Sequence, residues 1–174
     1  MELTGSRIIK ASRASVWQAL NDPEMLKAAI PGCSEMIRGE DGGFTAVVTQ
    51  KIGPVKARFK GVVTLSDIVE LESYTISGEG KGGAAGFAKG GAKVRLRDVE
   101  EGTELSYEVE ARVGGKLAQL GSRLVDGFAK KMADKFFSNF QLALEGPDEN
   151  EEPEEKKKGW LKRLVGGDKE EEAK

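Results

Sequence analysis

The stretch that decides the fold runs from Gly114 to Leu144 and reads GGKLAQLGSRLVDGFAKKMADKFFSNFQLAL. Its large apolar side chains recur every three or four residues, which is the spacing of one face of an α-helix, and they are Leu117, Leu120, Leu124, Phe128, Met132, Phe136 and Phe140. Gly146-Pro147 ends the predicted helix, because proline cannot continue it. At 1.5 Å per residue the helix would be about 45 Å long, and its apolar face needs a surface to lie against.

The strands that precede the helix supply that surface. The clearest of them spans 55–65, where Val55, Phe59 and Leu65 share one face of an alternating pattern and basic residues occupy the other. Similar patterns predict strands at 2–10, 33–39, 44–50, 74–78, 92–97 and 105–113. Strands in series followed by a helix indicate an α+β fold, in which an antiparallel sheet buries its apolar face against the helix.

Two short helices are predicted between the first strand and the second. Ser12 or Ser15 can accept a hydrogen bond from a free backbone N–H and so cap the first helix. Asp22-Pro23 starts the second helix, since proline fits the first helical position, and Pro31-Gly32 ends it.

The composition narrows the classes of function. The chain has 174 residues, 39% of them hydrophobic, which is enough for one core, and its net charge of −2 gives no general attraction to nucleic acid. It contains no histidine, so His-ligated zinc, a Ser-His-Asp triad and the commonest general base are excluded. With Cys33 as its one cysteine, it cannot form a disulfide framework. We find no signal peptide and no apolar run near the ~20 residues of a spanning helix, and we expect a cytoplasmic protein.

A glycine-rich run between 78 and 92 has few side chains large enough to fill a core. Its first letters, GEGKGG, fit the G-x-G-x-x-G pattern of dinucleotide-binding loops, but that site needs a helix directly afterwards, and here a strand follows. Strands of this composition leave empty volume against a core. We therefore expect the run to border a ligand cavity, with a flexible loop as the alternative.

Gly121 and Gly127 interrupt the long helix, where each costs about 1 kcal/mol relative to alanine. Two explanations are equally good, because the missing side chain of glycine allows either. The helix could pack closely on the sheet, or it could leave room for a ligand beside Leu120, Leu124 and Phe128. We interpret the other aromatic positions of the helix as core, namely Phe136, Phe137 and Phe140.

Several motifs occur in an order that resembles one family. Residues 16–23 read VWQALNDP, Leu26 follows, residues 30–33 read IPGC, residues 53–61 read GPVKARFKG, and GGKLAQLG begins the long helix. They resemble the carbon monoxide dehydrogenase G-subunit family of the START/Bet v 1-like (SRPBCC) superfamily, over residues 1–144. The resemblance implies a helix-grip fold, in which a curved antiparallel sheet wraps around the long C-terminal helix and leaves an internal ligand cavity. It also implies an accessory role beside a molybdenum-containing CO dehydrogenase or a related hydroxylase.

The composition changes at Glu145. Residues 145–155 are acidic and contain proline but no large apolar side chain, which predicts a disordered linker. Residues 156–167 form a basic amphipathic segment, for which we predict contact with an anionic membrane surface through Lys156, Lys157, Lys158, Trp160, Leu161, Lys162, Arg163, Leu164 and Val165. A groove on a partner protein and a purely solubilising tail are the alternatives. The acidic end, 168–174, should stay in solvent.

These observations favour a carrier over an enzyme, since no nucleophile is paired with a base and no metal site or covalent cofactor site is evident. The expected ligand is lipophilic, such as the respiratory quinone menaquinone, bound at the inner face of the cell membrane and exchanged with the dehydrogenase. The expected ligand-binding residues are Val55, Phe59, Tyr74, Ile76, Phe87, Val94, Tyr107, Leu117, Leu120, Gly121, Leu124 and Phe128. The hydroxyls of Tyr74 and Tyr107 are the candidate polar contacts. A recruitment or assembly factor for a molybdenum hydroxylase, without ligand transport, is the alternative, and a cyclase or hydrolase of small molecules is a third hypothesis.

Overall fold

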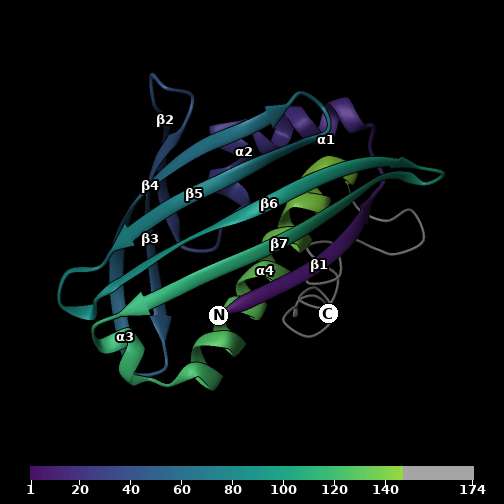
Figure 1. Ribbon diagram of the computed structural model, residues 1–174. Coiled ribbons are helices and arrows are strands. Elements are labelled where there is room, and N and C mark those ends of the chain that lie inside the picture. The colour runs from purple at the N-terminus through teal and green to yellow at the C-terminus, as the bar shows by residue number, and fades with distance from the viewer. Residues whose placement is uncertain (147–174) are drawn as a thin grey trace, which may run out of the picture. The chain divides into compact units, whose positions relative to one another are not determined.

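Seven antiparallel strands form one curved sheet, and the long helix α4 runs along its concave side (Figure 1). The structure is a computed structural model that describes residues 1–146. In chain order its elements are β1 (Glu2–Ile9), α1 (Arg13–Leu20), α2 (Pro23–Ala29), β2 (Cys33–Arg38), β3 (Phe44–Ile52), β4 (Val55–Val69), β5 (Ser73–Lys81), the 3₁₀ turn η1 (Gly83–Ala85), β6 (Phe87–Val99), β7 (Gly102–Gly114), α3 (Lys116–Gln119) and α4 (Ser122–Glu145). The predicted α+β order is confirmed.

Met1–Leu144 forms one compact unit. The predictions made for the rest of the acidic linker, for the basic amphipathic segment at 156–167 and for the acidic end at 168–174 lie outside the described residues. No helix within residues 1–146 combines the length and the apolarity that a membrane crossing requires.

The first strand of the chain pairs with the last. The order across the sheet is β1-β7-β6-β5-β4-β3-β2, and each neighbouring pair is antiparallel. Glu2 lies opposite Glu110, and the terminal amine of Met1 donates a hydrogen bond to the carbonyl of Ala111 at 3.0 Å. All other neighbours in the described sheet follow each other directly in the chain, so β1 has the one partner that is distant in sequence.

Side-chain caps start the two short helices. The hydroxyl of Ser12 accepts a hydrogen bond from the backbone N–H of Ser15 at 3.1 Å, so Ser12 is the cap of α1. The carboxylate of Asp22 accepts from the backbone N–H of Glu24 at 3.0 Å, and Pro23 occupies the first position of α2. Both predicted starting points are confirmed, and of the two serines considered for α1 the structure selects the first.

The strand register aligns the side chains that face α4 in rows across the sheet. One row consists of Leu65, Ile76, Ala92 and Val109, and the next consists of Tyr74, Val94 and Tyr107. Exposure alternates along β4 as its sequence predicts, with the basic residues on the convex side and the apolar residues on the concave side. We call the end of the sheet at which β3 and β5 end and β4 and β6 begin the α3 end, and we call the opposite end the α1 end.

Helix α4 is held to the rest of the molecule by its C-terminal half. Its buried residues are Phe137 and Phe140. In the same half, Asp134 forms an ion pair with Arg7 of β1 at 2.9 Å, and the side-chain amide of Asn139 donates to the carbonyl of Ala29 at 3.0 Å. The N-terminal half of α4 has no buried residue among those described, and Leu124 is 40% exposed.

The predicted helix from Gly114 onward is divided. Gly121 has a φ of +92°, a left-handed conformation that favours glycine, and it separates the single turn α3 from α4. The prediction of one unbroken helix was therefore wrong at this point. The break lets α3 fold against η1 and the end of β7, where Leu117 is buried, while α4 starts in a new direction.

Candidate functional site

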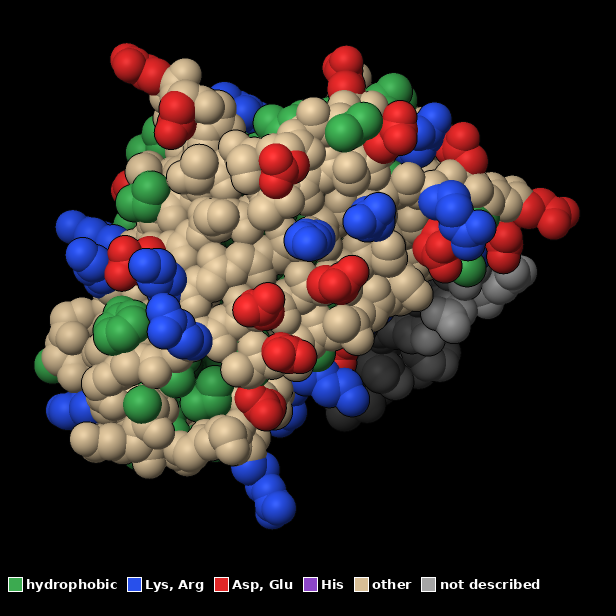
Figure 2. Space-filling view, in the orientation of Figure 1, with side chains coloured by type: hydrophobic (Ala, Val, Ile, Leu, Met, Phe, Trp, Pro, Cys, Tyr) green, Lys and Arg blue, Asp and Glu red, His purple; other side chains and the backbone are tan. Residues whose placement is uncertain are grey.

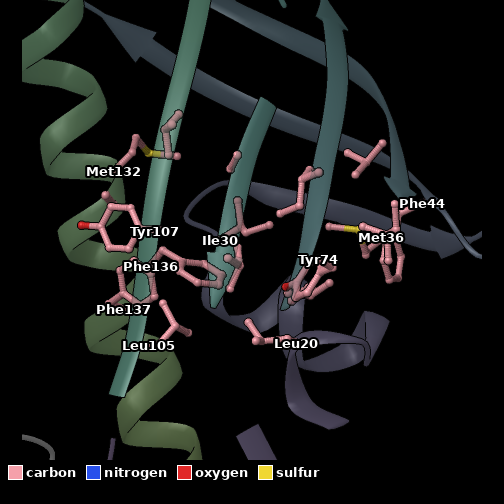
Figure 3. A pocket seen from close by; sticks show the side chains of 18 of the residues that line it. Leu20, Ile30, Met36, Phe44, Tyr74, Leu105, Tyr107, Met132, Phe136 and Phe137 are labelled. Atoms are coloured by element: carbon pink, nitrogen blue, oxygen red, sulfur yellow. The ribbon is translucent and has the colours of Figure 1, made fainter. Parts of the chain in front are cut away.

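An apolar cavity of about 380 Å³ lies between the concave side of the sheet and α4 (Figure 3). Helices α1 and α2, strands β2 to β7 and the middle of α4 all contribute to its wall, through Leu20, Leu26, Ile30, Pro31, Met36, Phe44, Val63, Leu65, Tyr74, Ile76, Ala92, Val94, Leu105, Tyr107, Val109, Met132, Ala133, Phe136 and Phe137. The two tyrosine hydroxyls are the polar groups that these side chains carry. The wall can therefore hold an apolar molecule and offers it very few hydrogen bonds.

Tyr74 is the buried polar group of this wall. Its side chain is 5% exposed, and its ring lies edge-on to Trp17, with 5.4 Å between the ring centroids. The Tyr74 hydroxyl makes no hydrogen bond to another described residue. Burial raises the pKa of this phenol well above its ordinary value, because the charged form would lose its hydration. The hydroxyl therefore stays protonated at physiological pH and remains available as a donor.

Tyr107 contributes its ring rather than its hydroxyl. The ring stacks on Phe137 with 5.0 Å between the centroids. Its hydroxyl lies over Gly5 of β1, where a Cβ atom would overlap it, and Figure 3 shows the oxygen pointing away from the middle of the cavity. Of the two tyrosines expected as polar contacts, Tyr74 is thus the one placed to meet a ligand.

An aromatic cluster on α4 closes one side of the cavity. Phe136 contacts Phe137 edge-on at 5.0 Å and stacks on Phe140 at 5.5 Å between centroids. Phe140 is fully buried core, as expected. Phe136 and Phe137 were also interpreted as plain core, and this was incomplete, because both line the cavity.

Four of the twelve expected ligand-binding residues line the cavity, namely Tyr74, Ile76, Val94 and Tyr107. The other eight do not, and they lie toward the α3 end. Val55 and Phe59 face the concave side there, half-buried. Phe87 is 41% exposed and packs over Gly114 on the convex side. The others belong to α3, the break and the N-terminal half of α4, and they are Leu117, Leu120, Gly121, Leu124 and Phe128.

The differences on the helix have a physical cause. The apolar stripe runs along the whole of α4, but the cavity lies beside the middle of the helix, from Met132 to Phe137, and not beside its first turns. The stripe gives no indication of which part of the helix meets the sheet.

The glycine-rich run forms the β5–β6 hairpin rather than a flexible loop, and its residue on the cavity wall is Ala92.

Sequence reasoning missed the contribution of the first forty residues. Leu20, Leu26, Ile30 and Met36 all reach the cavity from α1, α2, β2 and the connection between them. The sequence did indicate this contribution. The two short helices have apolar faces, and the apolar side of the sheet is the surface available for them to cover. Within residues 1–146 there is no group of three or more His, Cys, Asp or Glu side chains arranged to hold a metal ion.

The chain is similar to known proteins in both sequence and fold. Residues 5–145 match the model of a family described as CoxG, the G subunit of carbon monoxide dehydrogenase. A conserved protein from Geobacillus kaustophilus is 31% identical in sequence, with a TM-score of 0.76, and the match covers 83% of this chain and 95% of that one.

More distant structures share the fold. A START superfamily protein from Mycobacterium smegmatis is 14% identical, with a TM-score of 0.62 and coverage of 83% of this chain and 97% of that one. A protein from Rhizobium leguminosarum is 19% identical, with a TM-score of 0.65 and coverage of 84% and 95%. None of the curated proteins gives a significant match.

Proposed function

The chain belongs to the CoxG family, and from this we propose that it is a non-catalytic carrier of a lipophilic ligand. The proposed ligand is a respiratory quinone such as menaquinone. The carrier binds it at the cytoplasmic face of the membrane and exchanges it with a molybdenum-containing CO dehydrogenase or a related enzyme. The observation that carries the proposal is the apolar cavity with one buried hydroxyl, that of Tyr74, which has no hydrogen-bond partner within residues 1–146.

The size and chemistry of the cavity support a lipophilic ligand. Ligand pockets in proteins commonly measure about 300–1,000 Å³ and are mostly apolar with a few placed polar groups. The volume of about 380 Å³ falls in this range. Burying an isoprenoid chain here removes apolar surface from water, which is the main favourable term in such binding.

The Tyr74 hydroxyl supports a ligand with a hydrogen-bond acceptor. A buried donor without a partner costs about 1–3 kcal/mol, and a ligand acceptor removes that cost. A quinone ring carries carbonyl oxygens that can accept from this hydroxyl, whereas a hydrocarbon or the tail of a fatty acid cannot. Because the phenol stays protonated, it remains a donor over the whole physiological pH range.

The wall of the cavity supports carriage rather than catalysis. Besides the two phenols it presents alkyl, thioether and aromatic side chains and no carboxylate, amine or thiol. General acid–base and nucleophilic catalysis both need such groups within reach of the ligand. The proposed role is therefore to shield the ligand from water and release it unchanged.

The family description names carbon monoxide dehydrogenase, and the need for a carrier follows from the chemistry of that partner. An enzyme that oxidises its substrate in the aqueous phase requires an electron acceptor, and isoprenoid quinones are confined to the bilayer by the cost of exposing them to water. A protein that enclosed the quinone would connect the two phases. Neither a metal nor a covalent cofactor is needed for this role.

Native mass spectrometry of the protein purified from its own host tests the proposal. We expect one quinone per chain, identified after solvent extraction. Protein that is empty, and that also takes up no quinone from liposomes, would contradict the carrier function and favour the assembly-factor alternative.

A pair of helix variants tests whether the cavity is the site. Ala133→Phe places a ring into the cavity wall, and Ala129→Phe adds the same ring one turn earlier on α4, at a half-buried position outside the wall. Quinone uptake should fall at least tenfold in the first variant and change little in the second. Equal uptake by both would place the ligand elsewhere.

A further inference from the structure

The convex side of the sheet carries basic residues that oppose one another at the α3 end. Three register positions set two basic side chains directly across neighbouring strands, namely Lys51 and Lys56, Lys60 and Lys81, and Lys89 and Arg112. Like charges directly opposite each other destabilise a sheet. We call these six residues the basic end patch.

The rest of the same surface is arranged in the opposite way. There Lys93 lies opposite Glu108, and Arg97 forms an ion pair with Glu104 at 2.7 Å. Figure 2 shows this contrast, with Lys and Arg side chains gathered at the α3 end and acidic side chains along the middle of the sheet. The opposition of basic side chains is therefore local to the α3 end.

The basic end patch has few counter-charges within the described part of the chain, since only Glu79, opposite Lys89, and Glu110, two residues from Arg112 on the same side of β7, lie beside it. All six side chains are exposed, and none forms an ion pair with a residue between 1 and 146. Arg58 adds a seventh exposed positive charge between them, so the basic side chains outnumber these two acidic ones. An external anionic surface would relieve the repulsion.

Exposed apolar side chains lie at the same end. Phe87 sits opposite Lys81 on the convex side and is 41% exposed. Leu124 is 40% exposed and reaches Gly53 in the turn between β3 and β4. Basic residues that flank an exposed aromatic ring are typical of surfaces that lie in the headgroup region of a bilayer.

We propose that the α3 end docks on the anionic lipids of a membrane surface through the basic end patch and Phe87. The inference rests on the proposed function, because it names the membrane-facing end of the carrier. On the concave side at this end, half-buried Val55 and Phe59 share the face of β4 that carries Val63 and Leu65 of the cavity wall, so the β4 face between this end and the cavity is apolar. An acidic partner protein would neutralise the basic residues, but it would not explain the exposed ring of Phe87 or the apolar face of β4 at the same end.

A fluorescent probe at the docking end tests the orientation in the full chain. In a Cys33→Ser background, Phe87→Cys and Ile68→Cys each receive a polarity-sensitive label such as NBD; Ile68 is 56% exposed and belongs to the α1 end. With vesicles of phosphatidylcholine and phosphatidylglycerol, the label at 87 should shift to the blue and brighten, whereas the label at 68 should not. Vesicle-bound protein whose two labels respond equally, or do not respond, would overturn the proposal.

Charge variants test the basic end patch itself. Lys56→Gln/Lys60→Gln/Lys81→Gln removes three positive charges from the basic end patch, and Lys27→Gln/Lys93→Gln/Arg95→Gln removes three exposed positive charges from outside it. The first should reduce partition onto the anionic vesicles by at least tenfold, since each basic residue near such a surface contributes about fivefold, and raised salt should abolish the difference. Equal losses in the two variants would overturn the proposal, as would loss of binding to the dehydrogenase with vesicle binding intact.

The same variants separate this inference from the proposed function. Binding of a water-soluble, short-chain quinone in the absence of vesicles depends on the cavity alone. If the patch variant binds that quinone and also docks normally on vesicles, the carrier function stands and the docking surface is wrong. If the unmodified protein fails to bind the soluble quinone, the carrier function fails whatever the vesicles show.

Discussion

Single residues decide what the cavity can recognise. The wall is almost uniformly apolar. One buried hydroxyl therefore determines whether a hydrogen bond can fix the orientation of a bound ligand. Tyr74 occupies that position, with its ring fixed edge-on to Trp17. An unpaired buried donor lowers the stability of the empty protein and raises the affinity for a ligand with an acceptor.

Tyr74→Phe should therefore have effects of opposite sign. The variant keeps the ring and its contact with Trp17, so the ligand-free protein should be equally stable or more stable by about 1 kcal/mol, measured by urea unfolding. Quinone affinity should fall by about three- to tenfold, which is the value of one neutral hydrogen bond. Unchanged affinity would show that the hydroxyl does not contact the ligand.

The same tyrosine predicts a dependence on alkaline pH. Its pKa is raised in the folded protein and ordinary in the unfolded chain, so above about pH 10 the unfolded chain releases the proton first. The contribution of Tyr74 to the free energy of unfolding is complete below that pH and declines by up to about 1.4 kcal/mol per pH unit above it. The difference in stability between the wild type and Tyr74→Phe, measured from pH 8 to 11, should show this slope. A difference independent of pH would contradict the burial of the phenol.

At the scale of elements, the break at Gly121 separates two helices with different tasks. The turn α3 buries Leu117 at the end of the sheet, and α4 crosses the concave side to reach the aromatic cluster. The two glycines of this region, which the sequence leaves indistinguishable, have different roles. Gly121 needs its left-handed φ of +92°, whereas Gly127 lies within α4 with no atom close to where a Cβ would be.

Alanine at these two positions should change stability in opposite directions. Gly127→Ala should stabilise the protein by about 0.5–1 kcal/mol, because alanine is the better helix former and the space is open. Gly121→Ala should destabilise it by about 1–2 kcal/mol, since the left-handed conformation is strained for alanine. Urea unfolding of both variants measures this, and a destabilised Gly127→Ala would indicate that the helix packs closely there.

The two halves of α4 should also differ in how readily they unfold locally. Ion pairing to Arg7 and burial of Phe137 and Phe140 hold the C-terminal half, and no comparable contacts hold residues 122–130. Amide hydrogen exchange should be faster in 122–130 than in 135–144. Bound quinone should slow exchange around Met132 and Phe136, which line the cavity. Uniform protection along the helix would show that the N-terminal half is packed as firmly as the rest.

At the scale of the whole molecule, the sequence predicts the layers better than the site. Alternation such as that from Val55 to Leu65 identifies strands and their buried faces, because the period of a strand is local. The position of the cavity depends on which half of α4 crosses the sheet, and Leu124 and Phe136 are equivalent on the helical stripe. Phe136 is partly buried and Leu124 is exposed because of the positions of α1, α2 and the sheet, which local sequence does not determine. The unpaired hydroxyl of Tyr74 also follows from tertiary packing alone.

The pairing of the first strand with the last has a consequence for how the chain folds during synthesis. Met1 and Ala111 are separated by 110 residues, and at about 5–20 residues per second the ribosome needs roughly 5–20 s to produce the partner of β1. Until β7 emerges, β1 has no strand to pair with, and the edge of β6 that β7 will cover is also unpaired. Contacts so distant in sequence also slow folding, because a long loop must close before they form. The strand made first is thus the last to find its place, and the nascent chain spends that interval exposed to chaperones and to premature association.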